Sequence, residues 1–345
     1  MLPTHCHHRI RVAEQADLTA VRGAAAELSA AAALDEEAAG RVQLVVSELA
    51  TNLLHHADGG GAILLRRLDM PCGVECIALD RGPGIGDLAA ALADWTDPEP
   101  RAGQGLGYGL GAVRRLSDRF DIHSEAGLGT AVLSCVLKQG TGAAESAFEC
   151  GAVMLPMSGG NHCGDGWLVR PDGLVVAVDG LGHGEAASIA ARWAETIAWD
   201  AAQSDDPQTV LANMHDGLRG TRGVVAAVLR LTDRSIEYSS VGNITMTIIR
   251  RNGTTALTGR WGVVGYNAEP PPPARETWEP GDHLLLHSDG CTRLADSFLE
   301  RRLRHVDPVL AAAVLLRDGG THVDDQTVIV LRNSPRAPTA TGSNA

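Results

Sequence analysis

The sequence predicts two consecutive α/β (α+β) domains that combine helices with mostly antiparallel sheets. Its 345 residues suffice for two ordinary domains, each with its own core. Residues 139–147, QGTGAAESA, are small and polar without an apolar period, so they predict a linker. On both sides of it, strand-like runs often follow one another without a helix between them, which favours antiparallel pairing. We expect domains at 1–138 and 148–332, with a disordered tail at 333–345.

The first domain is expected to begin with a short alternating strand, RIRVA. Asp17 is the expected cap of a helix that runs through an alanine-rich stretch to about Ala33. A longer helix should run from about Asp35 to Ala57, and the glycines at 59–61 should end it. The strands ILLRRL and VECIALD follow, then a glycine-rich loop that opens a helix, and the strand TAVLSCVLK closes the domain.

The second domain shows more strands than helices. Strands are expected near 148–156, 166–170 and 174–179, and in GVVAAVLRL, SIEYSSVGNITMTIIR, HLLLHSD and QTVIVL; helices are expected from about Glu185 and near 208–219, 294–304 and 308–317.

The composition excludes several classes of partner. The 42 acidic and 29 basic residues give a net charge of −13, which argues against nucleic acid. No apolar run approaches the roughly 20 residues that cross a bilayer, and the N-terminus lacks the layout of a signal peptide. The seven cysteines show no CxxC motif and no framework spacing, so we expect reduced thiols in a cytoplasmic protein.

Acidic residues stand at the ends of apolar strands in the second domain. They are Asp165 in GDGWLV, Asp179 in VVAVDG, Asp289 in LLLHSDG, and Asp324 and Asp325 before TVIVL. Carboxylates beside glycines can form an all-oxygen site for hard divalent cations, and two such cations can activate a water for attack on phosphorus. An Asp-Gly pair also marks ordinary turns, so spacing alone leaves both interpretations open.

In this order, VDGLGHG, SVGNI, HSDG and DDQTVIV resemble the SpoIIE-type branch of the PPM (protein phosphatase type 2C) superfamily. TRGVVAAVLRL and WGVVGY are similar to small phosphatases that reset bacterial stress-signalling complexes. The resemblance covers most of 148–332 and implies a β-sandwich flanked by helices, with two Mn²⁺ or Mg²⁺ ions. Asn243 and His183 match further retained positions, whose roles stay open.

This resemblance assigns roles to individual residues. It implies that Asp179 bridges both metal ions, with help from the carbonyl of Gly180. Asp289 and Asp325 would complete one metal site, and Asp165 would hold a metal-bound water.

The long helix of the first domain carries Glu48 and Asn52, four residues apart and therefore on one face. A carboxylate can act as a base toward a hydroxyl, and an amide oxygen can bind Mg²⁺, although a solvated helix face would show the same pair. Asp80 ends a strand in IALDRGPGIGD, and GQGLGYGLGAVRRLSD offers backbone N–H groups and a helix N-terminus to a polyphosphate. The spacing is not the dinucleotide fingerprint, and a Walker lysine is absent.

Together with GLGTAV, these motifs resemble the GHKL (Bergerat) ATP-binding α/β sandwich over roughly residues 10–138, and within it the anti-sigma-factor serine kinases. The resemblance implies that Asn52 binds Mg²⁺, that Glu48 is the base on the acceptor serine, and that Asp80 accepts from the adenine amino group. It places the remaining residues around the nucleotide as follows: Gly82 and Gly84 give the adenine room, Gly105, Gly107 and Gly109 lie at the phosphates, Thr130 assists at the adenine end, and Arg114 or Arg115 either balances phosphate charge or lies on a solvated helix face.

The two resemblances together imply a fused kinase and phosphatase, using ATP with Mg²⁺ in one half and Mn²⁺ or Mg²⁺ in the other. The implied substrate is a STAS-domain protein of bacterial partner-switching, and through it a sigma factor or a downstream module. Such kinases often form homodimers, but no dimer face is readable in this sequence. Two alternatives stay open: the first half is a module that sequesters a partner, or it is a nucleotide sensor for the phosphatase. Retention of both Glu48 and Asn52 favours catalysis.

Overall fold

The structure is a computed structural model that describes residues 6–93, 109–140 and 148–334. The chain forms two compact units. The first unit combines Met1–Ala144 with His305–Asp318, and the second combines Glu145–Arg304 with Gly319–Ala345. Both units mix helices with antiparallel sheets, so the predicted fold class is confirmed.

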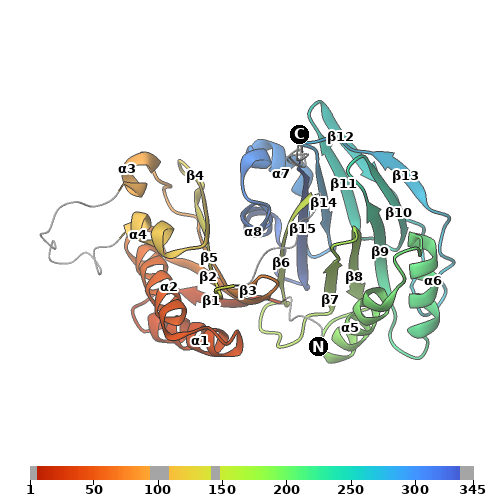
Figure 1. Cartoon of the computed structure of the whole chain (residues 1–345), viewed down its shortest axis with the longest axis horizontal. Helices are drawn as coiled ribbons and strands as arrows, with labels where there is room; N and C mark the ends of the chain where they lie inside the picture. Colours follow the sequence, from red (N-terminus) through yellow and green to blue (C-terminus); the bar gives the residue numbers. More distant parts are fainter. Residues whose placement is uncertain (1–5, 94–108, 141–147, 335–345) are drawn as a thin grey trace, which may run out of the picture. The chain divides into compact units, whose positions relative to one another are not determined.

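One five-stranded sheet forms the framework of the first unit, in the order β1-β2-β3-β5-β4, and all its pairs are antiparallel (Figure 1). Its elements are β1 (His8–Val12), α1 (Asp17–Ala31), α2 (Glu36–His56), β2 (Gly61–Asp69), β3 (Cys72–Asp80), α3 (Leu88–Leu92), α4 (Gly109–Leu116), β4 (Arg119–Glu125), β5 (Gly129–Leu137) and α8 (Pro308–Gly319).

Helices α1 and α2 bury their apolar side chains on one face of this sheet. Val42, Val45 and Leu49 of α2 belong to one buried cluster with Ile63 of β2 and Val74 of β3. Their spacing of three and four residues puts the α2 side chains on a single helical stripe. The core therefore fixes which face of α2 points away from the apolar cluster.

The two helix starts differ in how they are capped. Asp35 caps α2, because its carboxylate accepts a hydrogen bond from the Ala38 N–H at 2.8 Å. Asp17 does not cap α1, contrary to the sequence-based expectation. It is the first helical residue, and it accepts from the N–H groups of Ala13 and Glu14 at 2.8 and 2.9 Å. Asp17 therefore stabilises the turn before the helix, and these two bonds lower its pKa.

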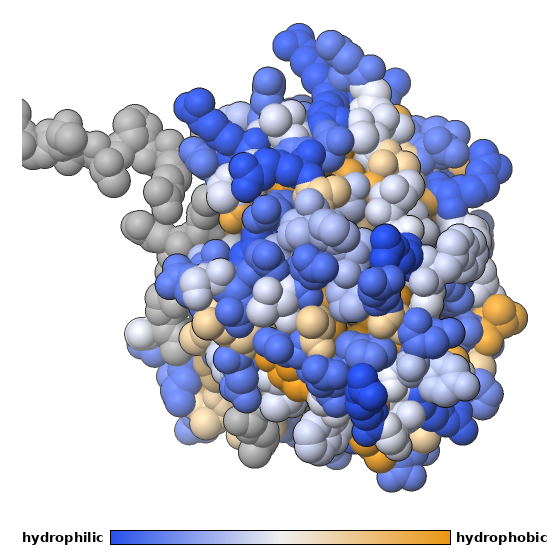
Figure 2. All heavy atoms as spheres, turned by 90° about the vertical axis from the view of Figure 1, so that its right-hand side faces the viewer, coloured by the Kyte–Doolittle hydropathy of each residue, from blue (hydrophilic) through white to orange (hydrophobic). Residues whose placement is uncertain are grey.

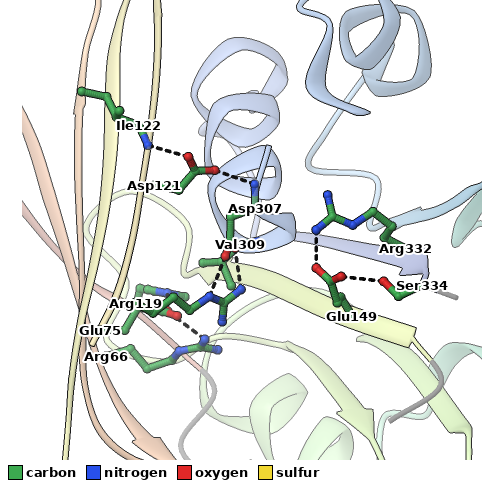
Figure 3. A network of polar contacts seen from close by, with 11 residues as sticks. Arg66, Glu75, Arg119, Asp121, Ile122, Glu149, Asp307, Val309, Arg332 and Ser334 are labelled. Carbon is green, nitrogen blue, oxygen red and sulfur yellow. Dashed lines mark hydrogen bonds and ion pairs between the residues drawn. The ribbon is translucent and has the colours of Figure 1, made fainter. Parts of the chain in front are cut away.

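Segment 305–318, predicted from the sequence to lie in the second domain, packs with the first unit. The Nε and Nη2 atoms of the Arg119 guanidinium each donate to one oxygen of the Asp307 carboxylate, both at 2.5 Å (Figure 3). The carboxylate of Asp121 accepts from the Asp307 N–H at 2.6 Å. Strand β4 therefore binds the residue that directly precedes α8, through a paired, charge-assisted contact.

A buried ion pair lies within the same sheet. Glu75 is buried, and its carboxylate contacts Arg66 at 2.7 Å (Figure 3). The same carboxylate contacts His7 at 2.9 Å. Burial alone would raise the pKa of Glu75, but Arg66 and the bond with His7 prevail and lower it to about 2. Glu75 is therefore ionised at neutral pH.

The second unit contains two five-stranded antiparallel sheets, in the orders β13-β10-β9-β8-β7 and β12-β11-β14-β15-β6 (Figure 1). Its elements are β6 (Phe148–Leu155), β7 (Asp165–Val169), β8 (Leu174–Gly180), α5 (Glu185–Asp200), α6 (Pro207–Gly217), β9 (Val224–Leu231), β10 (Ser235–Val241), β11 (Thr245–Arg250), β12 (Gly253–Leu257), β13 (Ala274–Thr277), β14 (His283–His287), α7 (Leu294–Glu300), a 3₁₀ turn (Leu303–His305) and β15 (Gln326–Asn333).

The strand β8 shows how this unit is layered. Val176 and Val178 pack in a cluster with α5 and α6, which cover one face of their sheet. Val175 and Ala177 alternate with them and are also buried, so they point to the opposite face, between the two sheets. The predicted sandwich with flanking helices is confirmed.

Helix α5 carries a buried acidic residue. The carboxylate of Glu195 accepts a hydrogen bond from the Trp167 N–H of β7 at 2.8 Å. Burial raises the pKa of Glu195 to about 8, although this bond and Arg192 act in the opposite direction. Glu195 is therefore mostly protonated at neutral pH.

Hydrophilic side chains cover most of the face that Figure 2 shows, and hydrophobic ones lie between them in small groups. In the described part of the chain, no helix combines the length and the apolar character needed to span a membrane.

Candidate functional site

Two neighbouring strands of the second unit bring Asp165 and Asp179 together. Asp165 is the first residue of β7, Asp179 is the penultimate residue of β8, and the two are direct partners in the antiparallel register. Directly paired residues in antiparallel strands have Cβ atoms about 5 Å apart. The N–H of Gly180 donates to the Gly164 carbonyl at 2.9 Å, which extends this pairing.

The other sheet contributes Asp325, which directly precedes β15. Its two carboxylate oxygens accept from the N–H groups of Met157, at 2.7 Å, and Gly164, at 2.6 Å. Since Gly164 immediately precedes Asp165, these bonds bring Asp325 to the ends of β7 and β8, where Asp165 and Asp179 lie. Asp324 lies beside it and accepts from the Asp325 N–H at 2.9 Å.

Asp289 lies in the loop after β14 and is oriented by a side chain from another loop. The amide of Asn243 donates to the Asp289 carboxylate at 2.9 Å, which gives this retained asparagine a positioning role. A Cβ atom on Gly290 would lie 2.0 Å from the carbonyl oxygen of Asp325. Only glycine at 290 therefore lets the loops of Asp289 and Asp325 approach so closely.

Ser288 is a further residue of this centre, which was not predicted from the sequence. Its hydroxyl donates to the Asp165 carboxylate at 2.7 Å and accepts from the Thr327 N–H at 3.0 Å. Ser288 precedes Asp289 in the HSDG motif, but nothing in the motif indicates which carboxylate its hydroxyl contacts. His183 is exposed in the loop between β8 and α5.

The electrostatics of this centre are strongly unfavourable to five free carboxylates. Burial raises the pKa of Asp165 to about 7, against the hydrogen bond from Ser288 and with help from the neighbouring Asp325 and Asp289. Burial, followed by the charges of four other aspartates, raises the pKa of Asp179 to about 9. The carboxylates thus repel one another, and nearby positive charge would favour their ionised forms.

The donors of this centre are all oxygens, which is the set that Mg²⁺ and Mn²⁺ prefer. Among the described residues, however, no three Asp, Glu, His or Cys side chains form a ready group of ligands. Both oxygens of Asp325 and one of Asp165 accept hydrogen bonds from N–H or O–H groups. The donor chemistry fits divalent cations, and the individual metal-binding roles stay predictions.

In the first unit, Glu48 is buried on α2 with Asn52 one turn later. Its carboxylate accepts from the Gly109 N–H, the first residue of α4, at 3.1 Å. Gly109 has a φ of +61°, a conformation that favours glycine. The structure therefore brings the predicted base to the start of the helix that follows the glycine-rich loop. Gly105 and Gly107 lie outside the described residues.

Asp80 organises the predicted adenine end. Its carboxylate accepts from the N–H groups of Gly82, at 2.7 Å, and Thr130, at 3.1 Å. A Cβ atom on Gly84 would lie 2.3 Å from the Glu125 carbonyl oxygen, so glycine is required there too. The structure thus brings Asp80, Gly82, Gly84 and Thr130 together. Arg114 and Arg115 are exposed at the end of α4.

Two further residues at this end were not found from the sequence. Gly129 has a φ of +92°, and a Cβ atom there would lie 2.2 Å from the Asp80 carbonyl oxygen. Arg317, within segment 305–318 of the first unit, donates to the same carbonyl oxygen at 2.8 Å. Both act on the backbone of Asp80 and could be found only from the folded chain.

The first half of the chain is similar to known kinases and ATPases. The family described as a histidine kinase-like ATPase domain matches residues 12–135. The serine/threonine-protein kinase RsbT of Bacillus subtilis (strain 168) is 37% identical over 93 residues, which cover 27% of this chain and 67% of that protein. The chain belongs to this kinase family.

The family of stage II sporulation protein E (SpoIIE) matches residues 172–334, so the chain joins a kinase-type ATPase domain to a SpoIIE-type phosphatase domain. The resemblances derived from the sequence are confirmed.

Solved structures resemble this chain at lower sequence identity. One from work on the bacterial stressosome is 29% identical and covers 54% of this chain and 99% of its own, with a TM-score of 0.48. The phosphatase domain of SpoIIE from Bacillus subtilis, with a fragment of its regulatory domain, is 16% identical over 93% of this chain and 96% of its own, with a TM-score of 0.47.

Proposed function

We propose that this protein is a bifunctional regulator of bacterial partner-switching. Its first domain phosphorylates a serine or threonine of a STAS-domain protein with ATP, and its second domain removes that phosphate. Through this substrate the protein controls a sigma factor or a downstream signalling module. We place it in the cytoplasm. The seven cysteines form no disulfide in the described part of the chain, which supports this location because disulfides are rare there.

For the kinase reaction, Glu48 is the proposed base toward the substrate hydroxyl. It is buried and held by the Gly109 N–H at 3.1 Å, so its carboxylate has a fixed position near the start of α4. Asn52 is the proposed Mg²⁺ ligand, one helical turn away. Asp80 would accept from the adenine amino group, with Thr130 beside it.

For the phosphatase reaction, we propose that Asp179 and the Gly180 carbonyl hold two divalent cations, with Asp289 and Asp325 completing one site. These cations, when bound, supply Lewis acidity and an activated water. The protein orients the carboxylates: Asn243 fixes Asp289, and the N–H groups of Met157 and Gly164 fix Asp325.

Asp165 would hold a water bound to the metal, and the Ser288 hydroxyl orients the Asp165 carboxylate. The Asp165 carboxylate is buried, and one of its oxygens accepts the hydrogen bond from the Ser288 hydroxyl. The remaining oxygen is available to accept a proton or a hydrogen bond from that water.

The observation that carries this proposal is the presence of both constellations in one chain, each assembled from separate elements. The test supplies a purified STAS-domain protein with ATP and Mg²⁺, then removes ATP and adds Mn²⁺, with phosphate followed by intact-protein mass spectrometry. We expect one phosphate to be gained in the first step and lost in the second.

Matched variants separate the two activities. Glu48→Gln should abolish only the gain, and Asp179→Asn should abolish only the loss. Glu27→Gln on α1 and Asp200→Asn on α5 remove similar charges at exposed positions and should change neither step. A STAS protein that gains no phosphate and, when phosphorylated by other means, loses none would refute the proposal.

One observation favours a second candidate function, in which the first domain senses nucleotide and controls the phosphatase. Arg317 donates to the Asp80 carbonyl at 2.8 Å. Residues 319–325, which follow its segment, end in Asp325 of the carboxylate centre. Within the second unit, Thr292 N–H donates to Gly319 O at 3.0 Å and Thr321 N–H to Gly290 O at 2.9 Å. A non-hydrolysable ATP analogue would then change phosphatase turnover, whereas ATP would transfer no phosphate to protein.

A further inference from the structure

The carboxylate centre of the second unit has a charge balance that does not favour its proposed substrate. Five aspartates meet there, Asp165, Asp179, Asp289, Asp324 and Asp325. Two divalent cations would still leave a formal charge of about −1, and a phosphoserine or phosphothreonine carries roughly −1.5 to −2 at neutral pH. A cationic side chain near the strand ends would offset this repulsion.

The pairing of β8 with β9 leads directly to such a side chain. Gly180 pairs with Val224, and the N–H of Leu181 donates to the Gly223 carbonyl at 3.2 Å, so the pairing continues beyond both strands. The next residue in this direction is Arg222. It therefore lies across from the loop that immediately follows Asp179.

The guanidinium of Arg222 lies over this loop. Its Nη1 atom is 3.5 Å from the Leu181 carbonyl oxygen. A Cβ atom on Gly182 would be 3.0 Å from the same nitrogen, so the guanidinium lies close to the backbone of Gly182. The end of the Arg222 side chain is thus beside the residues that follow Asp179, and it is exposed to solvent.

The backbone that carries Arg222 is fixed on both sides. The Thr221 hydroxyl donates to the Leu218 carbonyl at 2.7 Å and accepts from the Gly223 N–H at 3.0 Å. Gly223 has a φ of +78°, and a Cβ atom there would lie 2.6 Å from the Val264 carbonyl oxygen. This turn therefore positions the Arg222 side chain and does not act as a free surface loop.

The guanidinium of Arg222 is also available to bind an anion. Within residues 6–93, 109–140 and 148–334, Arg222 forms no ion pair with a carboxylate, whereas its neighbour Arg219 lies 3.4 Å from Asp216. Arg293, in the loop after Asp289, lies 3.9 Å from Asp296. Arg222 therefore combines a position beside the acidic centre with a charge that no described carboxylate pairs.

We propose that Arg222 binds the phosphoryl group of the phosphatase substrate. Its planar fork can donate two parallel N–H bonds to two phosphoryl oxygens, a geometry that lysine cannot reproduce. This assignment rests on the proposed phosphatase function and names the residue that recognises its substrate class, a phosphoserine or phosphothreonine ester.

The test compares Arg222→Ala and Arg222→Lys with Arg219→Ala in the full chain with Mn²⁺. With p-nitrophenyl phosphate, Arg222→Ala should raise KM about 10- to 100-fold, with a smaller effect on kcat, and Arg222→Lys should recover part of this loss. Isothermal titration with inorganic phosphate should show at least a roughly tenfold loss of affinity in Arg222→Ala. Arg219→Ala, three residues away and exposed, should match the unmodified protein in both measurements.

Three results would overturn the assignment: an unchanged KM and phosphate affinity in Arg222→Ala, equal losses in Arg219→Ala, or a parallel loss of Mn²⁺ affinity in Arg222→Ala. The third would give Arg222 a role in shaping the metal loop. Failure of the proposed function is distinguishable, since the protein would then hydrolyse no phosphoester while inorganic phosphate binding still depended on Arg222.

Discussion

Replacing Glu195 by glutamine should stabilise the second unit, because the folded protein holds this carboxyl in its neutral form. The side chain is 5% exposed on α5, and a Cβ atom on Gly166 would lie 2.6 Å from its oxygen. One oxygen accepts from the Trp167 N–H at 2.8 Å, and a glutamine oxygen can accept the same bond. The substitution therefore keeps the shape and the acceptor and removes the ionisable group.

The magnitude follows from the pKa of Glu195, which burial raises from 4.5 to about 8. Below pH 4.5 the carboxyl is neutral in both folded and unfolded chains and has no effect. Between pH 4.5 and 8 only the unfolded chain loses the proton, so stability falls by about 1.36 kcal/mol per pH unit. The glutamine variant escapes this loss, and its advantage should be about 1 kcal/mol at pH 5 and about 3 kcal/mol at pH 7.

Urea denaturation in EDTA, followed by tryptophan fluorescence at pH 5 and pH 7, measures this difference. Five of the six tryptophans belong to Glu145–Arg304, so the signal reports mainly on the second unit. Glu279→Gln removes the same charge at an exposed position and serves as the control. A Glu195→Gln variant whose advantage over the unmodified protein does not grow between pH 5 and pH 7 would refute the reasoning.

Three further predictions concern other parts of the fold. Asp35→Ala removes the hydrogen bond to the Ala38 N–H at the start of α2 and should cost about 1 kcal/mol in urea denaturation followed by circular dichroism; an unchanged midpoint would contradict the capping role. Arg119→Ala breaks the paired contact with Asp307 and should speed hydrogen exchange in α8, while exchange as slow as in the unmodified protein would show that this contact does not hold the helix. Burial raises the pKa of the Cys291 thiol to about 12, so it should react with a thiol reagent only after unfolding, and labelling of the folded protein at Cys291 would contradict this.

The sequence was sufficient to locate most of the carboxylate centre. An apolar run that breaks at Asp-Gly identifies the end of a strand, as at Asp179 and Asp289. That these ends meet depends on the register in which β7 pairs with β8, which places Asp165 opposite Asp179. Periodicity cannot supply that register, because it follows from contacts between distant segments. The hydroxyl of Ser288 illustrates this limit, since its bond to Asp165 spans 123 residues of sequence.

Other elements were missed for local reasons. Strand β4, RFDIHSE, has every residue half-buried, so its sequence lacks the alternation that marks a strand with one buried face. Asp17 has the residue type of a helix cap, but its carboxylate binds the preceding turn. Segment 305–318 lies between two strands of the second unit and within the residues that match the SpoIIE family, whereas its contacts group it with the first unit.

The grouping of residues 305–318 with the first unit has a consequence for synthesis on the ribosome. Met1–Ala144 leaves the ribosome first, and Asp318, the last residue grouped with it, lies 174 residues beyond Ala144. At roughly 5 to 20 residues per second, the first unit waits about 9 to 35 seconds for its last helix. During that interval most of the second unit emerges before residues 305–318 can reach the first unit. A shortened protein that ends at Ala144 would lack the contacts of Arg119 with Asp307 and of Asp80 with Arg317.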